Sequence, residues 1–363
     1  MSMRIYSNKA WRNIKGLSAY DSGAWRTMQG GWVYNNQAWR KFYNLPISVF
    51  TYSDGTTSTS RDTTITQASY TRTGKTLINA NMDDGVQAIG RSAFQNCQSL
   101  SGVTIPNSVI SIGSYAFQSC SDFQRTTGLR NIVIPNGVTS IGEWSFERCL
   151  LLRSLTIPDS VNTIGDRMCN SCRSLTGVTI GSGLSGSFVT GGQPSNTISN
   201  NIFTGCDALS AFAVSPNNLH FSNDAQGVLF NKNKSQLLIH PIGPSRTTYT
   251  VPDGVTSIAE LAFYYCTKLT SITISNSVTS LGTFAFIGCS NIPSFTIPSS
   301  VTVFGQGPFR NCNSCNKLYF KGSPPTLGQN GMYFTGTVYY CPTKPGWTAT
   351  FDNQPTVADN TLC

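Results

Sequence analysis

Residues Ile134–Cys149 read IPNGVTSIGEWSFERC, and this stretch decides the fold because close copies of it recur along the chain. The fullest copies are VTIPNSVISIGSYAFQSC (103–120), IVIPNGVTSIGEWSFERC (132–149), LTIPDSVNTIGDRMCNSC (155–172), ITISNSVTSLGTFAFIGC (272–289) and FTIPSSVTVFGQGPFRNC (295–312). Degenerate copies end at Cys97, Cys206 and Cys266. Uninterrupted copies follow one another every 23 residues. A unit this short cannot bury its own apolar face, so the units must stack into a solenoid.

The unit that begins at Leu100 shows how the first half of a coil is built. Leu100, Val103 and Ile105 are spaced so that we expect them to face the core from a short strand, with Thr104 facing outward. Pro106 ends this strand.

The second half of the same unit carries the chain around the coil. Val109 and Ile112 supply inward side chains, and Gly113 is expected to permit a tight bend. The segment 116–120 is expected to form a single helical turn on the far side. The predicted fold class is therefore mainly β with short helical turns, a right-handed solenoid with one parallel strand per coil.

The whole pattern IPxSVxxIGxxAFxxC resembles the BspA-type leucine-rich repeats of bacterial surface proteins, some parasitic protists and occasional phages. The resemblance covers roughly residues 75–340, and it implies adhesion or receptor binding by the solenoid surface and no catalysis. We accordingly expect a leucine-rich-repeat solenoid over residues 78–325. Because the end coils of a solenoid need a cover, residues 47–77 are expected to form a β-rich linker and N-terminal cap, and residues 326–363 a C-terminal cap.

A second repeat, with a period of 14, occupies residues 1–46 as YSNKAWR, YDSGAWR and YNNQAWR. Each copy places a three-residue turn between a Tyr and an Ala-Trp pair, which predicts three β-hairpins with an aromatic residue on each arm. Two interpretations stay open, namely a small aromatic-cored sheet without a ligand and a docking module. The repeat resembles aromatic AWR repeats of bacteriophage tail and other virion proteins, which implies docking. The candidate docking residues are Trp11, Arg12, Trp25, Arg26, Trp39 and Arg40.

Charge and composition exclude several classes of function. The net charge of +9 is concentrated in residues 1–46, where seven basic residues oppose Asp21 alone. The main fold therefore lacks the basic stripe of a nucleic-acid binder. No window approaches the ~18 apolar residues of a membrane span, so we expect no membrane insertion. The opening MSMRIYSNKAWRN has no apolar run, from which we expect no export by a signal peptide.

Eight cysteines share one repeat position and are expected to form an inward column: Cys97, Cys120, Cys149, Cys172, Cys206, Cys266, Cys289 and Cys312. Buried free thiols are one interpretation, and disulfides between coils are the alternative. CNSC occurs at 169–172 and at 312–315, and each copy could supply half a zinc site. The two lie about six coils apart and cannot meet, so we attribute both to the repeat.

Other sequence motifs that could indicate a catalytic or cofactor site lack the surrounding residues that such a site needs. GSGLSG (181–186) satisfies the dinucleotide fingerprint, but no helix-forming segment or βαβ unit surrounds it. His220 and His240 have no carboxylate or cysteine partner nearby in the sequence. We therefore expect no enzyme, no metal and no cofactor.

The outward strand position forms the candidate binding face, which consists of Thr104, Val133, Thr156, Thr179, Thr273 and Thr296. A hydroxyl-rich strip of this kind suits a glycan or a protein edge, although Thr is also simply a good residue for an exposed strand. Aromatic residues that could stack on sugar rings are expected on the side of the helical turns, at Tyr115, Trp144, Tyr264 and Tyr265.

Together these features predict a structural protein of a phage virion, a tail fibre, spike or receptor-binding protein. Its N-terminal hairpins would bind other tail or baseplate proteins, and its solenoid would recognise a host surface glycan or protein. Such a protein is assembled in the host cytoplasm and resides in the virion. The alternative is a cellular BspA-like adhesin or protein-interaction protein at the cell surface. The sequence leaves open whether the chain forms a homo-oligomer.

Overall fold

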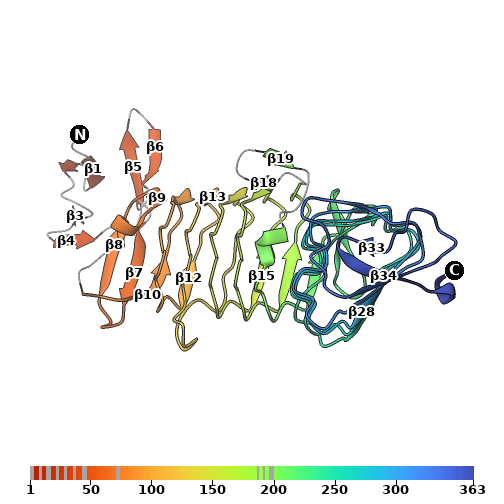
Figure 1. The fold of residues 1–363 in the computed structure, drawn as a ribbon. Helices are drawn as coiled ribbons and strands as arrows, with labels where there is room; N and C mark the ends of the chain where they lie inside the picture. Colours follow the sequence, from red (N-terminus) through yellow and green to blue (C-terminus); the bar gives the residue numbers. More distant parts are fainter. Residues whose placement is uncertain are drawn as a thin grey trace.

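The computed structural model of the protein describes some segments with their side chains and others by their backbone alone. Side chains are described for residues 47–70, 74–185 and 202–363, and the backbone alone for strands between residues 4 and 42 and for 188–190, 193–195 and 200–201. The coils stack into an elongated solenoid, and the first coils lie side by side across Figure 1. The later coils, coloured cyan to blue, overlie one another in the same view, so the axis of the stack turns between the two halves.

Most coils contribute one strand to the main parallel sheet face. Its strands are β10 (Leu77–Asn81), β12 (Gly102–Thr104), β15 (Ser154–Ile157), β17 (Gly177–Ile180), β20 (Ala211–Val214), β24 (Thr248–Thr250), β26 (Ser271–Thr273), β28 (Ser294–Ile297), β30 (Lys317–Phe320) and β32 (Thr337–Tyr340). In β15 the side chains of Leu155 and Ile157 are buried and Thr156 is exposed. In the unit from Leu100, Leu100 and Ile105 are buried and Val103 is partly buried, whereas Thr104 is exposed. The predicted alternation is thus confirmed.

Most coils of the described chain also carry a second, shorter strand that the sequence analysis missed. These strands are β11 (Ala88–Ile89), β13 (Ser111–Ile112), β14 (Ser140–Ile141), β16 (Thr163–Ile164), β25 (Ser257–Ile258), β27 (Ser280–Leu281), β29 (Val303–Phe304) and β31 (Thr326–Leu327). They pair in parallel, with Ile112 between Ile89 and Ile141. The expectation of one strand per coil was wrong because a strand of two residues is too short to show an alternating pattern in the sequence. The stacked coils nevertheless give each short strand neighbouring strands with which to pair.

The predicted helical turn at 116–120 is instead a run of tight turns. The amides of Tyr115, Phe117 and Ser119 donate to carbonyls of the next coil at 2.7–3.0 Å, and the intervening amides close turns within their own coil. Tyr115 and Ser119 have φ values of 60° and 55°. A helical turn would direct all its N–H groups along its own axis. The alternating backbone leaves every second amide free to bond the neighbouring coil, which is why the helical prediction was wrong.

Gly113 was expected to permit a tight bend, and the structure gives a different reason for it. Its φ lies outside the left-handed region, and a Cβ there would lie 2.7 Å from backbone atoms of Gly90 and Arg91 in the preceding coil. Equivalent clashes with backbone would occur at Gly142, Gly165, Gly282 and Gly305. Glycine therefore recurs at this position because neighbouring coils approach each other closely there.

Two aromatic columns fill the interior of the stack. Tyr70, Phe94, Phe117 and Phe146 stack in order with ring centroids 5.1–5.4 Å apart. The second column runs through His240, Phe263, Phe286 and Phe309 with centroids 5.0–5.9 Å apart. These distances are close to the spacing of neighbouring strands, so each coil adds one ring to its column.

The cysteine column is inward, as predicted, and its thiols are free. Cys120, Cys149, Cys172, Cys206, Cys266, Cys289 and Cys312 are buried, and Cys97 is half-buried. Five of these thiols donate to the carbonyl of a Phe in the preceding coil at 3.0–3.2 Å, namely Cys120, Cys149, Cys172, Cys289 and Cys312. Burial raises the pKa of the Cys289 thiol. The column thus consists of buried thiols and not of disulfides between coils.

The two CNSC segments are substitutions within the repeat. Cys169 takes the Phe position, since its carbonyl accepts a bond of 3.1 Å from the Cys206 thiol just as a Phe carbonyl does elsewhere. Met168 takes the preceding Ala position, so a large side chain next to a small one restores the lost volume. Cys315 takes the position of Leu100 in its own coil and is buried.

Both ends of the solenoid are covered by antiparallel strands. At the N-terminal end, β7 (Ser48–Tyr52) pairs with β8 (Thr57–Ser60) and with β10. At the C-terminal end, β34 (Gln354–Ala358) extends the sheet beside β32 and pairs with β33 (Thr350–Phe351). The limits 47–77, 78–325 and 326–363 remain predictions.

The hairpin predictions are confirmed for the backbone. Three antiparallel pairs form within residues 1–46: β1 (Arg4–Ser7) with β2 (Ala10–Asn13), β3 (Ser18–Asp21) with β4 (Ala24–Thr27), and β5 (Gly31–Asn35) with β6 (Ala38–Phe42). In each pair the Tyr lies opposite the Trp, as Tyr6 does with Trp11. The side chains of the candidate docking residues lie outside the described part of the chain, so their role remains a prediction.

Candidate functional site

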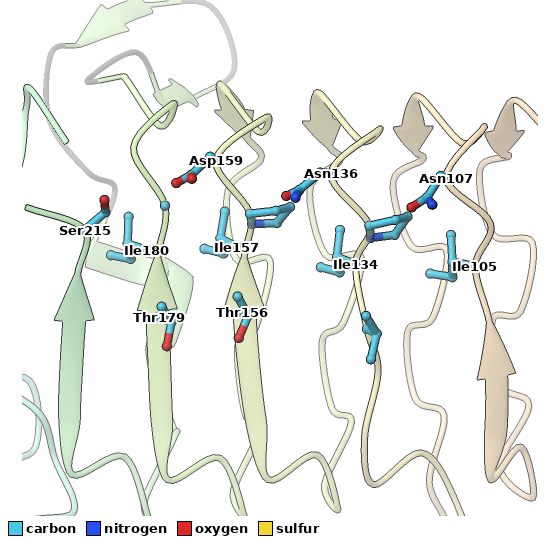
Figure 2. A pocket seen from close by; sticks show the side chains of 14 residues that line it. Ile105, Asn107, Ile134, Asn136, Thr156, Ile157, Asp159, Thr179, Ile180 and Ser215 are labelled. Carbon is cyan, nitrogen blue, oxygen red and sulfur yellow. The ribbon is translucent and has the colours of Figure 1, made fainter. Parts of the chain in front are cut away.

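Two shallow grooves lie on the outward face of the main sheet. The first has a volume of about 490 Å³ and extends from Ile105, just after β12, across the ends of β15 and β17 to Ser215. Figure 2 shows Ile134, Ile157 and Ile180 in a row along it, with the polar side chains of Asn136 and Asp159 beside them. The second groove, of about 550 Å³, crosses β24, β26 and β28. Both volumes fall within the range of ligand sites.

Each groove lies where the main sheet is interrupted. Residues 131–134, between β12 and β15, form no strand, and their unit is six residues longer than the uninterrupted 23-residue units because of the loop after Cys120. At the second groove an interruption separates β26 from β28, which do not pair with each other. Pro293 precedes β28 and has no N–H, whereas its counterpart Thr270 donates to the Thr247 carbonyl at 2.7 Å. Local sequence changes therefore open the sheet at both grooves, and a further break lies between β20 and β24, which do not pair.

Five of the six predicted face residues line these grooves. Val133, Thr156 and Thr179 line the first, and Thr273 and Thr296 line the second. Val133 is 78% exposed. Thr104 lines neither groove, and its Oγ1 donates to Asn81 Oδ1 at 2.7 Å.

The predicted Thr ladder is not continuous. Thr156 pairs with Thr179, but the next residue in register is Ala213. In the second half Thr250, which the sequence analysis missed, pairs with Thr273. Beyond Thr296 the outward row changes in character and continues as Tyr319, Tyr339 and Val357. Alignment of KLYF (317–320) and TVYY (337–340) with SFTI (294–297) could have identified the two tyrosines.

The hydroxyls of the grooves differ from the other threonine hydroxyls of the stack. Thr139, Thr176, Thr256, Thr270 and Thr279 each donate to a carbonyl of the preceding coil at 3.0–3.2 Å. In the described part of the chain, by contrast, no side-chain hydrogen bond uses the hydroxyl of Thr156, Thr179, Thr250, Thr273 or Thr296. These five hydroxyls are therefore available to a ligand.

Two of the four aromatic residues on the turn side, Tyr115 and Trp144, do not offer free ring faces. The Arg91 guanidinium lies 4.8 Å from the Tyr115 ring centroid, and Arg167 lies 4.7 Å from that of Trp144. The Tyr115 and Trp144 rings stack on each other with centroids 6.1 Å apart. Both faces of both rings are covered, so this pair cannot stack on sugars as the sequence suggested. Tyr264 and Tyr265 also contact each other, with ring centroids 4.7 Å apart.

The fold brings together a Cys–His pair that the sequence analysis missed. His240 Nδ1 lies 3.4 Å from Cys266 Sγ, and Arg246 Nε lies 3.4 Å from His240 Nε2. Burial, and then the positive charge of Arg246, lower the pKa of His240 to about 3. Burial also raises the pKa of Cys266. A nucleophilic cysteine needs a lowered pKa, so this neutral pair serves packing, with His240 in the aromatic column.

The glycine-rich signature is also explained by packing. A Cβ at Gly181 or Gly183 would lie 2.0–2.6 Å from backbone of the Pro158–Asp159 segment, so these glycines permit close approach of coils; Gly186 lies outside the described residues. His220 has an exposed side chain. Within the described ranges no group of three or more His, Cys, Asp or Glu side chains is placed to hold a metal ion. No helix in those ranges has the length and apolar character needed to cross a membrane.

Stacked short coils with an inward Leu and Ile pattern and two parallel strands each define a leucine-rich-repeat solenoid. The chain belongs to the BspA type leucine rich repeat family, whose model matches residues 63–186, 121–226 and 244–340. The matched region begins after the aromatic hairpins. A comparison with curated protein sequences finds no match.

Several solved structures are similar to the chain. A leucine-rich repeat protein from Eubacterium ventriosum is 26% identical, with a TM-score of 0.56, over 71% of this chain and 64% of that one. The chain thus spans less than two thirds of that protein. A leucine rich cell surface protein from Faecalibacterium prausnitzii is 22% identical, with a TM-score of 0.42, over 76% and 93% of the two chains. The pneumococcal vaccine antigen PcpA is 15% identical, with a TM-score of 0.47, over 91% and 99%.

Proposed function

We propose that the protein is a surface-recognition protein, an adhesin or protein-interaction protein, that contacts its target through the outward face of the main sheet. The observation that carries this proposal is that two open grooves are lined by threonine hydroxyls that make no side-chain hydrogen bond within the described fold. Because the face is built from stacked, mutually bonded coils, it is held rigid for binding. Membership of the BspA-type family supports the same class of function.

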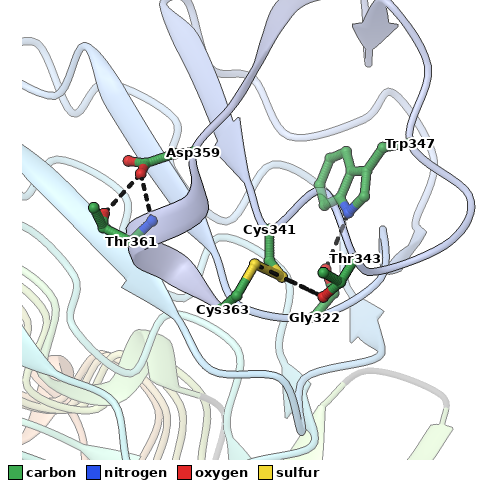
Figure 3. The surroundings of a disulfide bond; sticks show 7 residues. All are labelled: Gly322, Cys341, Thr343, Trp347, Asp359, Thr361 and Cys363. Carbon is green, nitrogen blue, oxygen red and sulfur yellow. Dashed lines mark hydrogen bonds between the residues drawn. A yellow bond between two sulfur atoms is a disulfide. The ribbon is translucent and has the colours of Figure 1, made fainter.

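We favour a location at the cell surface over the virion. Cys341 and Cys363 form a disulfide near the C-terminus, beside the bond from Trp347 Nε1 to the Gly322 carbonyl (Figure 3). Disulfides persist in oxidising surroundings such as the cell exterior. The family match and the similar solved structures lend no support to a tail fibre, and they favour the alternative prediction of a cellular surface protein.

A phage tail fibre stays a second candidate on one observation, the three hairpins that pair Tyr with Trp. On this proposal the hairpins bind tail or baseplate proteins. Deletion of residues 1–43 should then leave target binding intact and remove the protein from assembled particles. A truncated chain that still assembles would contradict docking by the hairpins.

The proposed role is recognition and not catalysis. The repeat positions that the described fold brings together hold hydroxyls and apolar groups, and the His240–Cys266 pair is buried and neutral. A partner that contacts a flat, rigid face needs complementary shape and hydrogen bonds, which the grooves provide.

Binding of the labelled full chain to intact bacterial cells and to cultured epithelial cells would test the proposal. We expect Thr156→Arg combined with Thr273→Arg, which fills both grooves, to weaken binding at least about tenfold. Thr104→Arg is the matched control, because Thr104 is exposed on the same face outside both grooves. Equal binding by the groove variant would exclude this face, and absence of binding to every surface would overturn recognition itself.

A further inference from the structure

Two outward tyrosines follow the second groove in the strand register, although neither is one of its lining residues. Tyr319 of β30 is the register partner of Thr296, a lining residue of the groove, and Tyr339 of β32 is the partner of Tyr319. The two rings stack with centroids 5.0 Å apart and an interplanar angle of 27°. Both side chains are half-buried, and Val357 beyond them is 43% exposed.

The stacking fixes the direction in which the rings face. Neighbouring strands lie about 4.8 Å apart, and the ring centroids are separated by nearly the same distance. The rings therefore stand on the sheet and face each other along the solenoid axis. One face of Tyr319 is covered by Tyr339, so its other face is directed toward Thr296, a lining residue of the groove.

The floor and sides of this groove are rich in hydrogen-bonding groups. Hydroxyls of Thr250, Ser271, Thr273, Ser294 and Thr296 line it. One carboxylate, one amide and one ammonium complete the lining, on Asp253, Asn276 and Lys321. Asp253 Oδ1 accepts from Ser275 Oγ at 2.6 Å, which holds the carboxylate in place. Because one acid is balanced by one base, the groove selects for neither sign of charge.

We infer that this groove, with the Tyr319 ring beside Thr296, binds an uncharged oligosaccharide. Sugars present several hydroxyls that both donate and accept hydrogen bonds, together with an apolar ring face that packs on an aromatic side chain. Three strand spacings separate Thr250 from Tyr319, so the groove is roughly 14 Å long, the length of a short oligosaccharide. This inference rests on the proposed function and gives it a ligand class.

The first groove provides an internal comparison. It has the same type of outward threonines, but its exposed apolar residue is Val133, and the residue in register after Thr179 is Ala213 and not a tyrosine. A groove without an aromatic ring next in register is predicted to bind sugars weakly or not at all. A substitution at Thr156 therefore matches one at Thr273 in chemistry and exposure, and differs from it only in the groove that it alters.

The test uses the full chain on an array of uncharged hexose and N-acetylhexosamine oligosaccharides, followed by calorimetry with the strongest binder. We expect Tyr319→Ala to weaken binding at least about tenfold, and Tyr319→Phe, which keeps the ring, to bind like the wild type. Thr273→Ala should weaken binding and Thr156→Ala should not. A melting curve identifies any misfolded variant. Thr296→Arg, which blocks the groove without removing the Tyr319 ring, should also weaken oligosaccharide binding.

Each outcome decides the inference. Weaker oligosaccharide binding by Tyr319→Ala and by Thr273→Ala supports the inference, whereas unchanged affinity in both variants excludes this groove. If no oligosaccharide binds but the chain still attaches to cells, the sugar inference fails, the proposed recognition stands and the ligand is a protein. If neither the array nor any cell surface is bound, both proposals fail.

Discussion

Gly165 is the closest point of contact between coils among the glycines that follow the second strands. A Cβ added to Gly165 would lie 2.1 Å from Glu143 N and 2.4 Å from Glu143 Cα, both in the preceding coil. The Gly165 amide also donates to the Ile141 carbonyl at 2.8 Å. Its φ lies outside the left-handed region, so Gly165→Ala tests contact between coils and not backbone conformation.

The size of the effect follows from these distances. Ordinary contacts between heavy atoms are about 3.5 Å, so the two backbones must separate by more than about 1 Å. Such a shift takes the 2.8 Å hydrogen bond beyond its usual range of about 3.2 Å. Overpacking of this kind costs about 1–3 kcal/mol and the lost hydrogen bond about 1 kcal/mol. We expect Gly165→Ala to lower the free energy of unfolding by about 3 kcal/mol.

Urea denaturation followed by far-ultraviolet circular dichroism would measure this loss. Gly177→Ala is the matched control, because Gly177 lies in β17 and the nearest atom to an added Cβ is the Ala211 carbonyl oxygen at 3.9 Å. The control should unfold at the same urea concentration as the wild type, or slightly higher. If Gly165→Ala were as stable as Gly177→Ala, close approach would not be the reason for glycine here.

Three further predictions concern stability. The pKa of His240 is lowered to about 3, so the unfolded chain takes up the proton first as the pH falls. The free energy of unfolding should therefore decrease by about 1.4 kcal/mol per pH unit below about 6.5. Urea titrations at pH 7 and pH 5 should show this decrease in the wild type and not in His240→Phe. Cys341→Ser opens a disulfide with a sequence separation of 22 residues, which should destabilise the C-terminal cap by about 3 kcal/mol; limited proteolysis should cut this variant faster, and added reductant should accelerate only the wild type. Phe286→Ala removes a fully buried ring between Phe263 and Phe309 and should cost about 3–5 kcal/mol; a loss below about 1 kcal/mol by denaturation would show that the column does not stabilise the stack.

The sequence predicts well whatever depends on one unit alone. Alternation around Leu155 and Thr156 identifies a strand and its outward side, and the repeat position of Cys120 places its thiol in the interior. Both features depend only on the repeat pattern and on the need to bury apolar surface. The same reasoning identified five of the residues that line the grooves.

Features that depend on contact between coils were not predictable in this way. The left-handed backbone at Tyr115 exists because alternate amides bond the next coil. Pro293 interrupts the sheet because it has no N–H at a position where its counterpart Thr270 donates a hydrogen bond to the preceding coil. His240 meets Cys266 because a histidine replaces a phenylalanine of the column, a substitution that no local motif marks.

The cysteine column gives the molecule a built-in set of reporters of local opening. Nearly every coil hides one thiol, and a thiol shielded by its neighbours reacts with an alkylating reagent only when its own coil opens. Because a coil of a solenoid contacts only its neighbours, opening can begin at an end or at a break in the sheet. The order in which the buried Cys120, Cys149 and Cys289 become alkylated in native buffer would therefore show whether opening starts at an end of the solenoid or at a break in the sheet.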